Sequence, residues 1–347
     1  MLDSKVMVPA TIITGFLGSG KTTLLNRLLR HVAFRHSLII INEFGEVGID
    51  HLIVAAPAAN VRLLANGCLC CEMRGELVET LDACLRMRGT GELARFERVL
   101  IETSGLADPV PIVHSLVSEP ALAGAYRLDS ILTVVDALHG ASQVCAHDEA
   151  RKQVALADTV LLSKTDLATG SEVAETKGAV RQINPGAAIL MAGAAVSDPC
   201  ALLAAHPLAK LPAIVAKEPT HGTLRDGIAT FGFTVERPAS VAGLSTWLSM
   251  LASFKAEHLL RVKGIVNVEN QPFVIDLVQS VIHEPLPLER WPSADQRTRL
   301  VFIVRDLRRE AIERTLCAFD LGDRLPATRG FDPAAYVRFA EAAKRFF

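Results

Sequence analysis

The sequence predicts an α/β protein with a mainly parallel β-sheet covered by helices on both faces, followed by a smaller α+β domain. Over roughly the first 190 residues, short β-branched apolar runs alternate with longer helix-like stretches, a pattern typical of parallel sheets. Half of the residues are hydrophobic but only 5% are aromatic, which indicates aliphatic cores. A stretch rich in Ala and Pro at 197–222 then separates a first domain, 1–196, from a second domain, 223–347.

The first domain is expected to begin with a strand and to return to a strand after each helix-like stretch. Its predicted strands are Pro9–Thr14, Leu38–Ile41, Val99–Glu102, Ser130–Asp136, Thr159–Ser163 and Ala188–Met191. Its predicted helices are Lys21–His31, Glu76–Met87 and Ser171–Ile183. Because ligands of parallel sheets bind beyond the carboxyl ends of the strands, polar residues at those ends are candidate site residues.

The second domain is expected to contain four strands and two helices, and it has a common domain size. Its predicted strands are Ile228–Val235, Leu259–Val268, Phe273–Val278 and Arg299–Val304. Its predicted helices are Ser240–Leu251 and Leu307–Phe319. This order of elements is typical of an α+β domain.

Charge and composition exclude several classes of partner. The chain has 36 Lys and Arg residues against 38 Asp and Glu residues, so we expect no binding driven by nucleic-acid phosphates or by a membrane surface. The N-terminus lacks a signal-peptide pattern, and no apolar run approaches the roughly 20 residues of a membrane helix. Seven cysteines, three of them within four positions, do not resemble a secreted disulfide framework. We therefore expect a cytoplasmic protein.

A phosphate-binding loop is predicted by GFLGSGKTT, residues 15–23, which lies between a predicted strand and a predicted helix. It contains the pattern G-x-x-x-x-G-K-T, whose glycines let backbone N–H groups approach a polyphosphate at the positive end of a helix. Lys21 is expected to reach the β- and γ-phosphates, and Thr22 to place its hydroxyl on Mg²⁺. The expected nucleotide contacts of this loop are Gly15, Gly18, Ser19, Gly20, Lys21, Thr22 and Thr23.

The segment SKTDL, which follows the strand Thr159–Ser163, indicates guanine as the base. Asp166 can accept hydrogen bonds from the ring N–H and the exocyclic amine of guanine, a donor pair that adenine lacks. The stem of Lys164 can pack over the base. GTPases usually have Asn at the position of Ser163, and the shorter serine is expected to support the loop less well. The alternative interpretation of this segment is a solvated turn before a helix.

Two more strand ends carry acidic residues. Glu43 follows the second predicted strand and Glu102 ends the third; carboxylates there can bind Mg²⁺ directly or through water. Gly105 is expected to offer its backbone N–H to the γ-phosphate and so to sense whether that phosphate is present. Taken singly, either acid could be an ordinary loop charge. No side chain stands out as the one that positions the hydrolytic water.

Three cysteines form the motif C-x-C-C at Cys68, Cys70 and Cys71. Thiolates are ligands for Zn²⁺ or Cu(I), and three of them with an open fourth position suit a site that loads and releases metal. The alternative interpretation is a redox dithiol. The motif lies between Glu43 and Glu102 in the chain, so metal and γ-phosphate binding are expected to be coupled, and reciprocally so. The other cysteines are interpreted as small buried apolar residues: Cys84, Cys145, Cys200 and Cys317.

The motifs together resemble those of the CobW-type metallochaperone GTPases, a branch of the P-loop metallocentre-assembly GTPases that include urease and hydrogenase nickel chaperones. The segments that carry the resemblance are GFLGSGKTTLLNRLL, INEFGEVGID, NGCLCC, ETSGLADP and SKTDL, followed in the second domain by LLRVKGIV and RWPSADQRTRLVFIVRDL. The resemblance covers nearly the whole chain. It implies a protein that hydrolyses GTP to GDP and phosphate, binds Zn²⁺ or a related ion such as Co²⁺ at the C-x-C-C motif, and delivers it to a client metalloprotein.

The resemblance also implies Mg²⁺ and switch roles for Glu43 and Glu102, which with Lys21 are the candidate catalytic residues. Many relatives carry a histidine-rich stretch near the domain junction, whereas this chain has only His206 and His221 there. The second domain is expected to carry client or self-association contacts, and the sequence names no client. Two other functions stay open, an interaction protein with a static structural zinc and a P-loop kinase of small molecules.

Overall fold

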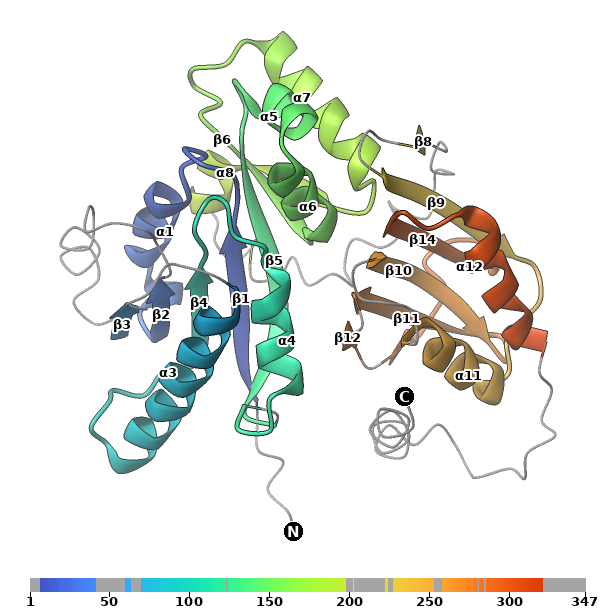
Figure 1. The fold of residues 1–347 in the computed structure, drawn as a ribbon, viewed down its shortest axis with the longest axis horizontal. Coiled ribbons are helices and arrows are strands. Elements are labelled where there is room, and N and C mark those ends of the chain that lie inside the picture. The colour runs from blue at the N-terminus through green and yellow to red at the C-terminus, as the bar shows by residue number, and fades with distance from the viewer. Residues whose placement is uncertain are drawn as a thin grey trace. The chain divides into compact units, whose positions relative to one another are not determined.

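The computed structural model describes residues 7–41, 60–63, 70–122, 124–197, 202, 222–223, 227–252, 258–279, 281–283 and 285–320. The chain divides into two compact units, Met1–Ala209 and Lys210–Phe347, which are drawn together in Figure 1 and described separately below. Most of the predicted linker 197–222 lies outside the described residues. Within these residues, no helix is long and apolar enough to span a membrane.

The first unit is built on a parallel sheet, as predicted. Its seven described strands run in the order β3-β2-β4-β1-β5-β6-β7, and every neighbouring pair is parallel. The strands are β1 (Val8–Thr14), β2 (Ser37–Ile41), β3 (Asn60–Leu63), β4 (Arg98–Glu102), β5 (Tyr126–Asp136), β6 (Thr159–Ser163) and β7 (Ala188–Met191). The edge strand β3 was not predicted, because NVRL has only four residues and two of them are polar.

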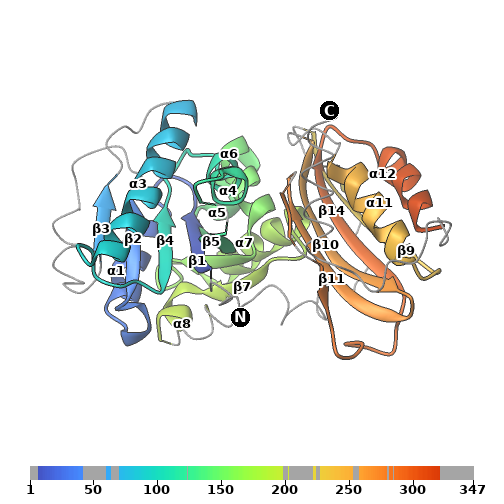
Figure 2. The same cartoon turned by 90° about the horizontal axis from the view of Figure 1, so that it is seen from below.

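Helices cover both faces of this sheet, with α1 and α8 on one side and α3, α4 and α6 on the other (Figure 2). The helices are α1 (Lys21–Leu29), α3 (Cys70–Thr90), α4 (Val110–Ser118), α5 (Gly140–Ala146), α6 (Asp148–Leu156), α7 (Gly170–Ile183) and α8 (Ala192–Ser197), with a 3₁₀ turn at Val32–Phe34. Helix α3 begins at Cys70 rather than at Glu76 as predicted.

Four of these helices were missed by the sequence analysis. Helix α4 is VPIVHSLVS, a nine-residue segment whose three valines and one isoleucine also suit a strand. Helices α5, α6 and α8 have seven, nine and six residues, and elements this short give a weak periodic signal.

The core under α1 explains how the phosphate-binding loop is held. Leu24, Leu25 and Leu28 are at most 3% exposed and share an aliphatic cluster with Ile13 of β1 and Ile39 of β2. Burying one such side chain contributes about 1.5–3 kcal/mol. The helix that follows the loop is therefore anchored to the sheet by one apolar stripe.

The second unit is an antiparallel sheet with helices on one face. Its described strands run in the order β12-β11-β10-β14-β9-β8, with β13 beside β11. They are β8 (Gly222–Thr223), β9 (Ile228–Val235), β10 (Leu259–Val268), β11 (Gln271–Val278), β12 (Val281–Ile282), β13 (Leu286–Pro287) and β14 (Thr298–Arg305). Strands β10 and β11 form a hairpin in which Glu269 and Asn270 have φ values of 51° and 71°, as expected of a tight two-residue turn.

The helical layer of this unit consists of α11 (Val241–Ala252), α12 (Arg309–Leu316) and a 3₁₀ turn at Cys317–Asp320. Its core differs from the aliphatic core that the composition predicts. Trp247 is fully buried, meets Phe302 and Phe319 edge-on, and donates a 3.0 Å hydrogen bond from its indole N–H to Thr315. Four aromatic residues thus take part in this core, Phe233, Trp247, Phe302 and Phe319, which an average composition does not reveal.

Candidate nucleotide-binding site

The phosphate-binding loop joins β1 to α1 as predicted and is held in a fixed backbone shape. Gly15 has a φ of 147°, and a Cβ atom there would lie 2.3 Å from the carbonyl oxygen of Val134, so no other residue fits. Gly20 is the N-cap of α1 with a φ of 93°, and no side chain caps this helix end. The first N–H groups of α1 therefore remain available to an anion.

Lys21 lies inside this loop. Its side chain is only 7% exposed, and Nζ donates hydrogen bonds to the carbonyl oxygens of Gly15 at 2.8 Å and Phe16 at 3.3 Å. The ammonium group is thus held over the loop, where the sequence analysis expects the β- and γ-phosphates.

Two predicted Mg²⁺ ligands, 80 residues apart in the chain, are brought together at the start of α1 and the end of β4. The hydroxyl of Thr22 donates a 2.6 Å hydrogen bond to Oε1 of Glu102, and Glu102 is fully buried. A hydroxyl and a carboxylate oxygen fit the oxygen ligands that Mg²⁺ prefers. The third candidate, Glu43, lies outside the described residues, so its role stays a prediction.

Ser163, at the end of β6, contacts the phosphate-binding loop directly. Its hydroxyl lies 2.6 Å from the carbonyl oxygen of Ser19 and 3.3 Å from that of Val135. The two backbones are therefore close enough for the short side chain to reach, and the expectation that serine supports the loop less well than asparagine stays a prediction. Gly20 shows the same proximity, since a Cβ atom there would lie 3.8 Å from Cβ of Ser163.

Lys164 is fixed by a partner that the sequence analysis missed. Its Nζ donates a 2.7 Å hydrogen bond to Oδ2 of Asp136, whose side chain is 1% exposed and also accepts from the N–H groups of Leu138 and His139. Burial opposes ionisation of Asp136, but these hydrogen bonds outweigh it and lower the pKa of the carboxyl. The available signal was its place at the end of the predicted strand Ser130–Asp136.

A pocket of about 380 Å³ opens beside these residues. Its lining comes from α1, the end of β6 and α8: Gly20, Thr23, Leu24, Arg27, Leu162, Ser163, Lys164, Thr165, Asp166, Leu167, Ala192, Gly193 and Val196. The size lies within the usual range of small-molecule sites, about 300–1,000 Å³. Lys164 and Asp166, predicted to contact the base, both line this pocket, and Asp166 is exposed to solvent.

Gly105 also lies against the phosphate-binding loop. A Cβ atom at this position would approach the N and Cα atoms of Leu17 to 2.8 Å, so only glycine permits the contact. The segment from Thr103 to Asp108 follows β4. The hydroxyl of Thr103 donates a 2.9 Å hydrogen bond to the hydroxyl of Thr14 at the end of β1. The residue predicted to sense the γ-phosphate is therefore next to the loop that would hold it.

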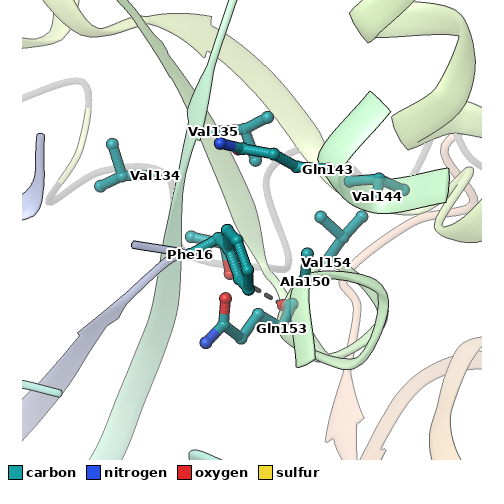
Figure 3. Close-up of a pocket in the computed structure, with 9 residues that line it drawn as sticks. Phe16, Val134, Val135, Gln143, Val144, Ala150, Gln153 and Val154 are labelled. Atoms are coloured by element: carbon teal, nitrogen blue, oxygen red, sulfur yellow. Dashed lines mark hydrogen bonds between the residues drawn. The ribbon is translucent and has the colours of Figure 1, made fainter. Parts of the chain in front are cut away.

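Phe16 of the phosphate-binding loop lies beside residues of α5 and α6 (Figure 3). There it borders a small cavity of about 10 Å³, together with Gln153 and Ala150 of α6. Its ring stacks on that of His147 with a centroid distance of 4.5 Å. The back of the loop is thus supported by the short helices that the sequence analysis did not predict.

The predicted zinc ligands cannot be compared with the structure. Cys68 lies outside the described residues, and the helix α3 begins with Cys70 and Cys71. Among the residues that are described, no three His, Cys, Asp or Glu side chains are grouped so that they could hold a metal ion. The C-x-C-C site therefore stays a prediction.

The interpretation of the other cysteines as buried is correct for one and wrong for two. Cys84 is buried within α3, whereas Cys145 and Cys317 are exposed. Cys145 is on the short helix α5, which leaves this position open to solvent, and Sγ of Cys317 lies 2.8 Å from the carbonyl oxygen of Arg314. Cys200 lies outside the described residues.

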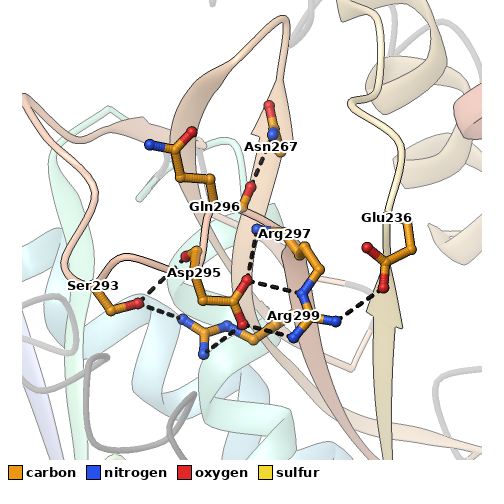
Figure 4. Close-up of polar contacts among 7 residues, drawn as sticks. All are labelled: Glu236, Asn267, Ser293, Asp295, Gln296, Arg297 and Arg299. Atoms are coloured by element: carbon orange, nitrogen blue, oxygen red, sulfur yellow. Dashed lines mark hydrogen bonds and ion pairs between the residues drawn. The ribbon is translucent and has the colours of Figure 1, made fainter.

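In the second unit, the clearest polar cluster is a network of charged residues that pair with one another (Figure 4). Arg297 donates to both carboxylate oxygens of Asp295, at 2.9 and 3.0 Å, and to Glu236 at 2.9 Å. Arg299 lies 3.4 Å from Asp295. Hydrogen bonds from Arg297 lower the pKa of Asp295 to about 2. This network indicates a stabilised surface rather than a reactive site.

Both units of the chain match families of known proteins. Residues 9–191 match the family "CobW/HypB/UreG, nucleotide-binding domain", and residues 228–319 match the "Cobalamin synthesis protein cobW C-terminal domain". The chain is 32% identical to the zinc chaperone YjiA of Escherichia coli, over 76% of this chain and 83% of the relative. It is 31% identical to the zinc chaperone CobW of Pseudomonas aeruginosa, over 89% and 90%.

A solved structure supports the fold. The crystal structure of the Zn(II)-bound YjiA GTPase from E. coli matches with a TM-score of 0.67, at 24% identity, and the match covers 90% of this chain and 99% of that one. The predicted fold class, a parallel sheet with helices followed by a smaller α+β domain, is therefore confirmed.

Proposed function

This chain belongs to the CobW/HypB/UreG family, as its motifs predicted, and we propose that it is a GTP-hydrolysing metallochaperone that binds Zn²⁺ and delivers it to a client metalloprotein. The observation that carries the proposal is the bond between Thr22 and Glu102, which joins the phosphate-binding loop to the end of β4. It supports the proposal because a hydroxyl and a carboxylate that meet beside the phosphate-binding loop are suitable Mg²⁺ ligands, in a family with relatives that are zinc chaperones.

The nucleotide half of the function follows from the loop. Lys21 now donates to the carbonyl oxygens of Gly15 and Phe16, and on binding GTP its ammonium group turns to the β- and γ-phosphates. Thr22 and Glu102, with Glu43, are the residues that would hold Mg²⁺, whose charge offsets the negative charge of the phosphates. As in other switch GTPases, we expect intrinsic hydrolysis to be slow, about 10⁻⁴–10⁻² s⁻¹.

Guanine is selected in the pocket beside α8. Asp166 accepts from the ring N–H and the exocyclic amine of guanine. An adenine in the same pocket would leave this carboxylate unpaired, which costs about 1–3 kcal/mol when the group is desolvated. The ion pair between Lys164 and Asp136 holds the lysine stem in one direction, so that it can cover the base.

The metal half rests on Cys68, Cys70 and Cys71, with Zn²⁺ as the cargo and a related ion such as Co²⁺ as an alternative cargo. In the chain these thiols lie between Glu43 and Glu102. A movement of that segment on loss of the γ-phosphate would change the geometry of the thiols, and metal binding would in turn change the affinity for GTP. Client and self-association contacts are assigned to the second unit.

The substitution Cys70→Ala tests the metal site, with Cys84→Ala as the matched control, since Cys84 is a buried cysteine in the same helix. We expect Cys70→Ala to weaken Zn²⁺ binding by more than about tenfold, equivalent to 1.4 kcal/mol, in a titration against a competing chelator. GTP affinity should stay within about twofold, a change of less than 0.5 kcal/mol. Unchanged Zn²⁺ affinity would refute the site, and unfolding of the wild type on chelation would favour a static structural zinc.

A further inference from the structure

Helix α6 contacts the segment from Thr103 to Asp108 at three residues. The side-chain amide of Gln153 donates hydrogen bonds to the carbonyl oxygens of Gly105 at 3.2 Å and Ala107 at 3.1 Å. The neighbouring residue, Lys152, forms an ion pair with Asp108. The backbone of this segment is therefore tied to α6 at the glycine that is proposed to sense the γ-phosphate.

Gln153 is held in the first unit by hydrogen bonds of both its backbone and its side chain. Its side chain is 1% exposed, and its backbone carbonyl accepts a 2.9 Å hydrogen bond from the hydroxyl of Thr133 in β5. Both amide N–H groups are used on Gly105 and Ala107, while Oε1 has no hydrogen-bond partner among the described residues. The side chain is therefore held in one orientation, with its two donors directed at the backbone of the segment.

The contacts continue from α6 to the phosphate-binding loop. Gly105 lies against Leu17, and His147, the N-cap of α6, stacks on Phe16. Helix α6 therefore supports both the loop that binds the phosphates and the segment that meets the terminal phosphate. Of these contacts, the two hydrogen bonds from Gln153 are the ones that fix the backbone of that segment.

We propose that Gln153 is a positioning residue for recognition of the γ-phosphate. It touches no nucleotide; it holds Gly105 where the backbone N–H meets the terminal phosphate. Without its two N–H donors, the segment samples other positions, and the affinity for GTP falls in proportion to the fraction of molecules in which the segment stays correctly placed. GDP lacks the γ-phosphate, so its affinity does not depend on that fraction. This inference rests on the proposed function, because it requires that GTP binds and that Gly105 senses it.

The test compares Gln153→Met with Asn184→Ala. Methionine has a similar length and no N–H donors. Asn184 is the matched control because it is also a buried amide, 2% exposed, that donates to carbonyl oxygens of the same helix end, Val154, Ala155 and Ala157. Among the described residues, the hydrogen bonds of the Asn184 side chain do not reach the segment from Thr103 to Asp108. Affinities for a non-hydrolysable GTP analogue and for GDP, both with Mg²⁺, are measured by titration, together with thermal unfolding.

We expect both variants to unfold at lower temperature. Only Gln153→Met should reduce the ratio of GTP-analogue affinity to GDP affinity, by at least about fivefold, the lower end of usual coupling between sites. Lys152→Met, at a half-buried position, should change the ratio in the same direction by less, and it replaces Gln153→Met as the test if that variant does not fold.

An unchanged ratio in Gln153→Met, or an equal change in Asn184→Ala, would overturn the proposal while leaving the GTPase function in place. Failure of the wild type to bind the GTP analogue would instead overturn the proposed function, and this inference with it.

Discussion

The two sheets of this chain arrange their polar side chains in opposite ways. In the parallel sheet of the first unit, β4, β5 and β6 all end at the same edge, and each ends in a buried polar residue: Glu102, Asp136 and Ser163. In the antiparallel sheet of the second unit, neighbouring strands end at opposite edges, and its charges pair across strands instead, as Arg261 does with Asp276 at 3.0 Å.

The difference shows how topology creates a site. Burying a carboxylate is unfavourable unless it is compensated, and a parallel sheet collects several such groups beside one loop. Glu102 meets Thr22 and Asp136 meets Lys164, so each acid is directed at a residue expected to contact the nucleotide. In the second unit, acids and bases neutralise one another, which suits stability and surface recognition.

The largest expected contrast between the two units comes from a buried lysine in each. Lys21→Met should weaken GTP and GDP binding about 100-fold or more, because two or more charge-assisted hydrogen bonds to phosphate are lost, each worth about 1.5–3 kcal/mol. Lys263→Met removes an equally buried lysine from β10, 5% exposed, and should lower thermal stability without changing nucleotide affinity. Nucleotide affinity is measured by titration with a fluorescent nucleotide. Equal losses of nucleotide affinity in both variants would contradict the assignment of the phosphate site to the first unit.

Glu102→Gln should have the next largest effect. We expect single-turnover GTP hydrolysis to fall about 100-fold, as is usual when one charge-stabilising group is removed, and the Mg²⁺ concentration for half-maximal activity to rise. The control is Glu236→Gln in the second unit, an exposed acid paired with Arg297, which should hydrolyse GTP at the wild-type rate. Wild-type Mg²⁺ dependence in Glu102→Gln would argue against its role as a metal ligand.

Asp166→Ala should narrow the preference for GTP over ATP by about 10- to 100-fold, corresponding to roughly 1–3 kcal/mol. The matched control is Glu172→Gln, a nearby acid that caps α7 through Thr169 and is not expected to contact the base. Competition between the two nucleotides measures the preference. If Asp166→Ala keeps the wild-type preference, the base is recognised by other residues.

A smaller, pH-dependent effect is expected for Lys164→Met. The pKa of Asp136 is lowered in the folded protein, so its ion pair contributes stability above the ordinary carboxyl pKa of 3.8, and this contribution is lost as pH falls through the lower folded value. The free energy of unfolding of the wild type should exceed that of the variant by about 1–2 kcal/mol at pH 7. The two free energies should converge below pH 3.8. Denaturant titrations across pH would show a constant difference if the pair were not responsible.

The smallest effect is expected at the exposed network of the second unit. Asp295→Asn breaks the pairing with Arg297, yet exposed ion pairs contribute little. We expect a change within the uncertainty of an extrapolated unfolding free energy, about 10–15%, and wild-type nucleotide binding. A clear loss of GTP affinity would show that the second unit takes part in the nucleotide site.

The comparison also explains which features could be predicted from the sequence. The phosphate-binding loop and the strands that end in polar residues were predicted, because their signals are local: a fixed glycine spacing, apolar runs and a polar residue at each end. Asp136 and Gln153 were missed as site residues because their importance depends on partners 28 and 48 residues away. Helices α5 and α6 are too short to give a strong periodic pattern. Their residues nevertheless contact both the phosphate-binding loop and the segment from Thr103 to Asp108.

The central claim is that nucleotide state controls metal binding, and one titration tests it most directly. The reduced wild-type protein is titrated with Zn²⁺ against a competing chelator in three parallel samples: with a GTP analogue and Mg²⁺, with GDP and Mg²⁺, and without nucleotide. We predict that Zn²⁺ affinity differs between the GTP and GDP states by at least about tenfold, a coupling of 1.4 kcal/mol. Identical affinity in all three samples would contradict the metallochaperone account and leave a GTPase whose cysteines serve another purpose.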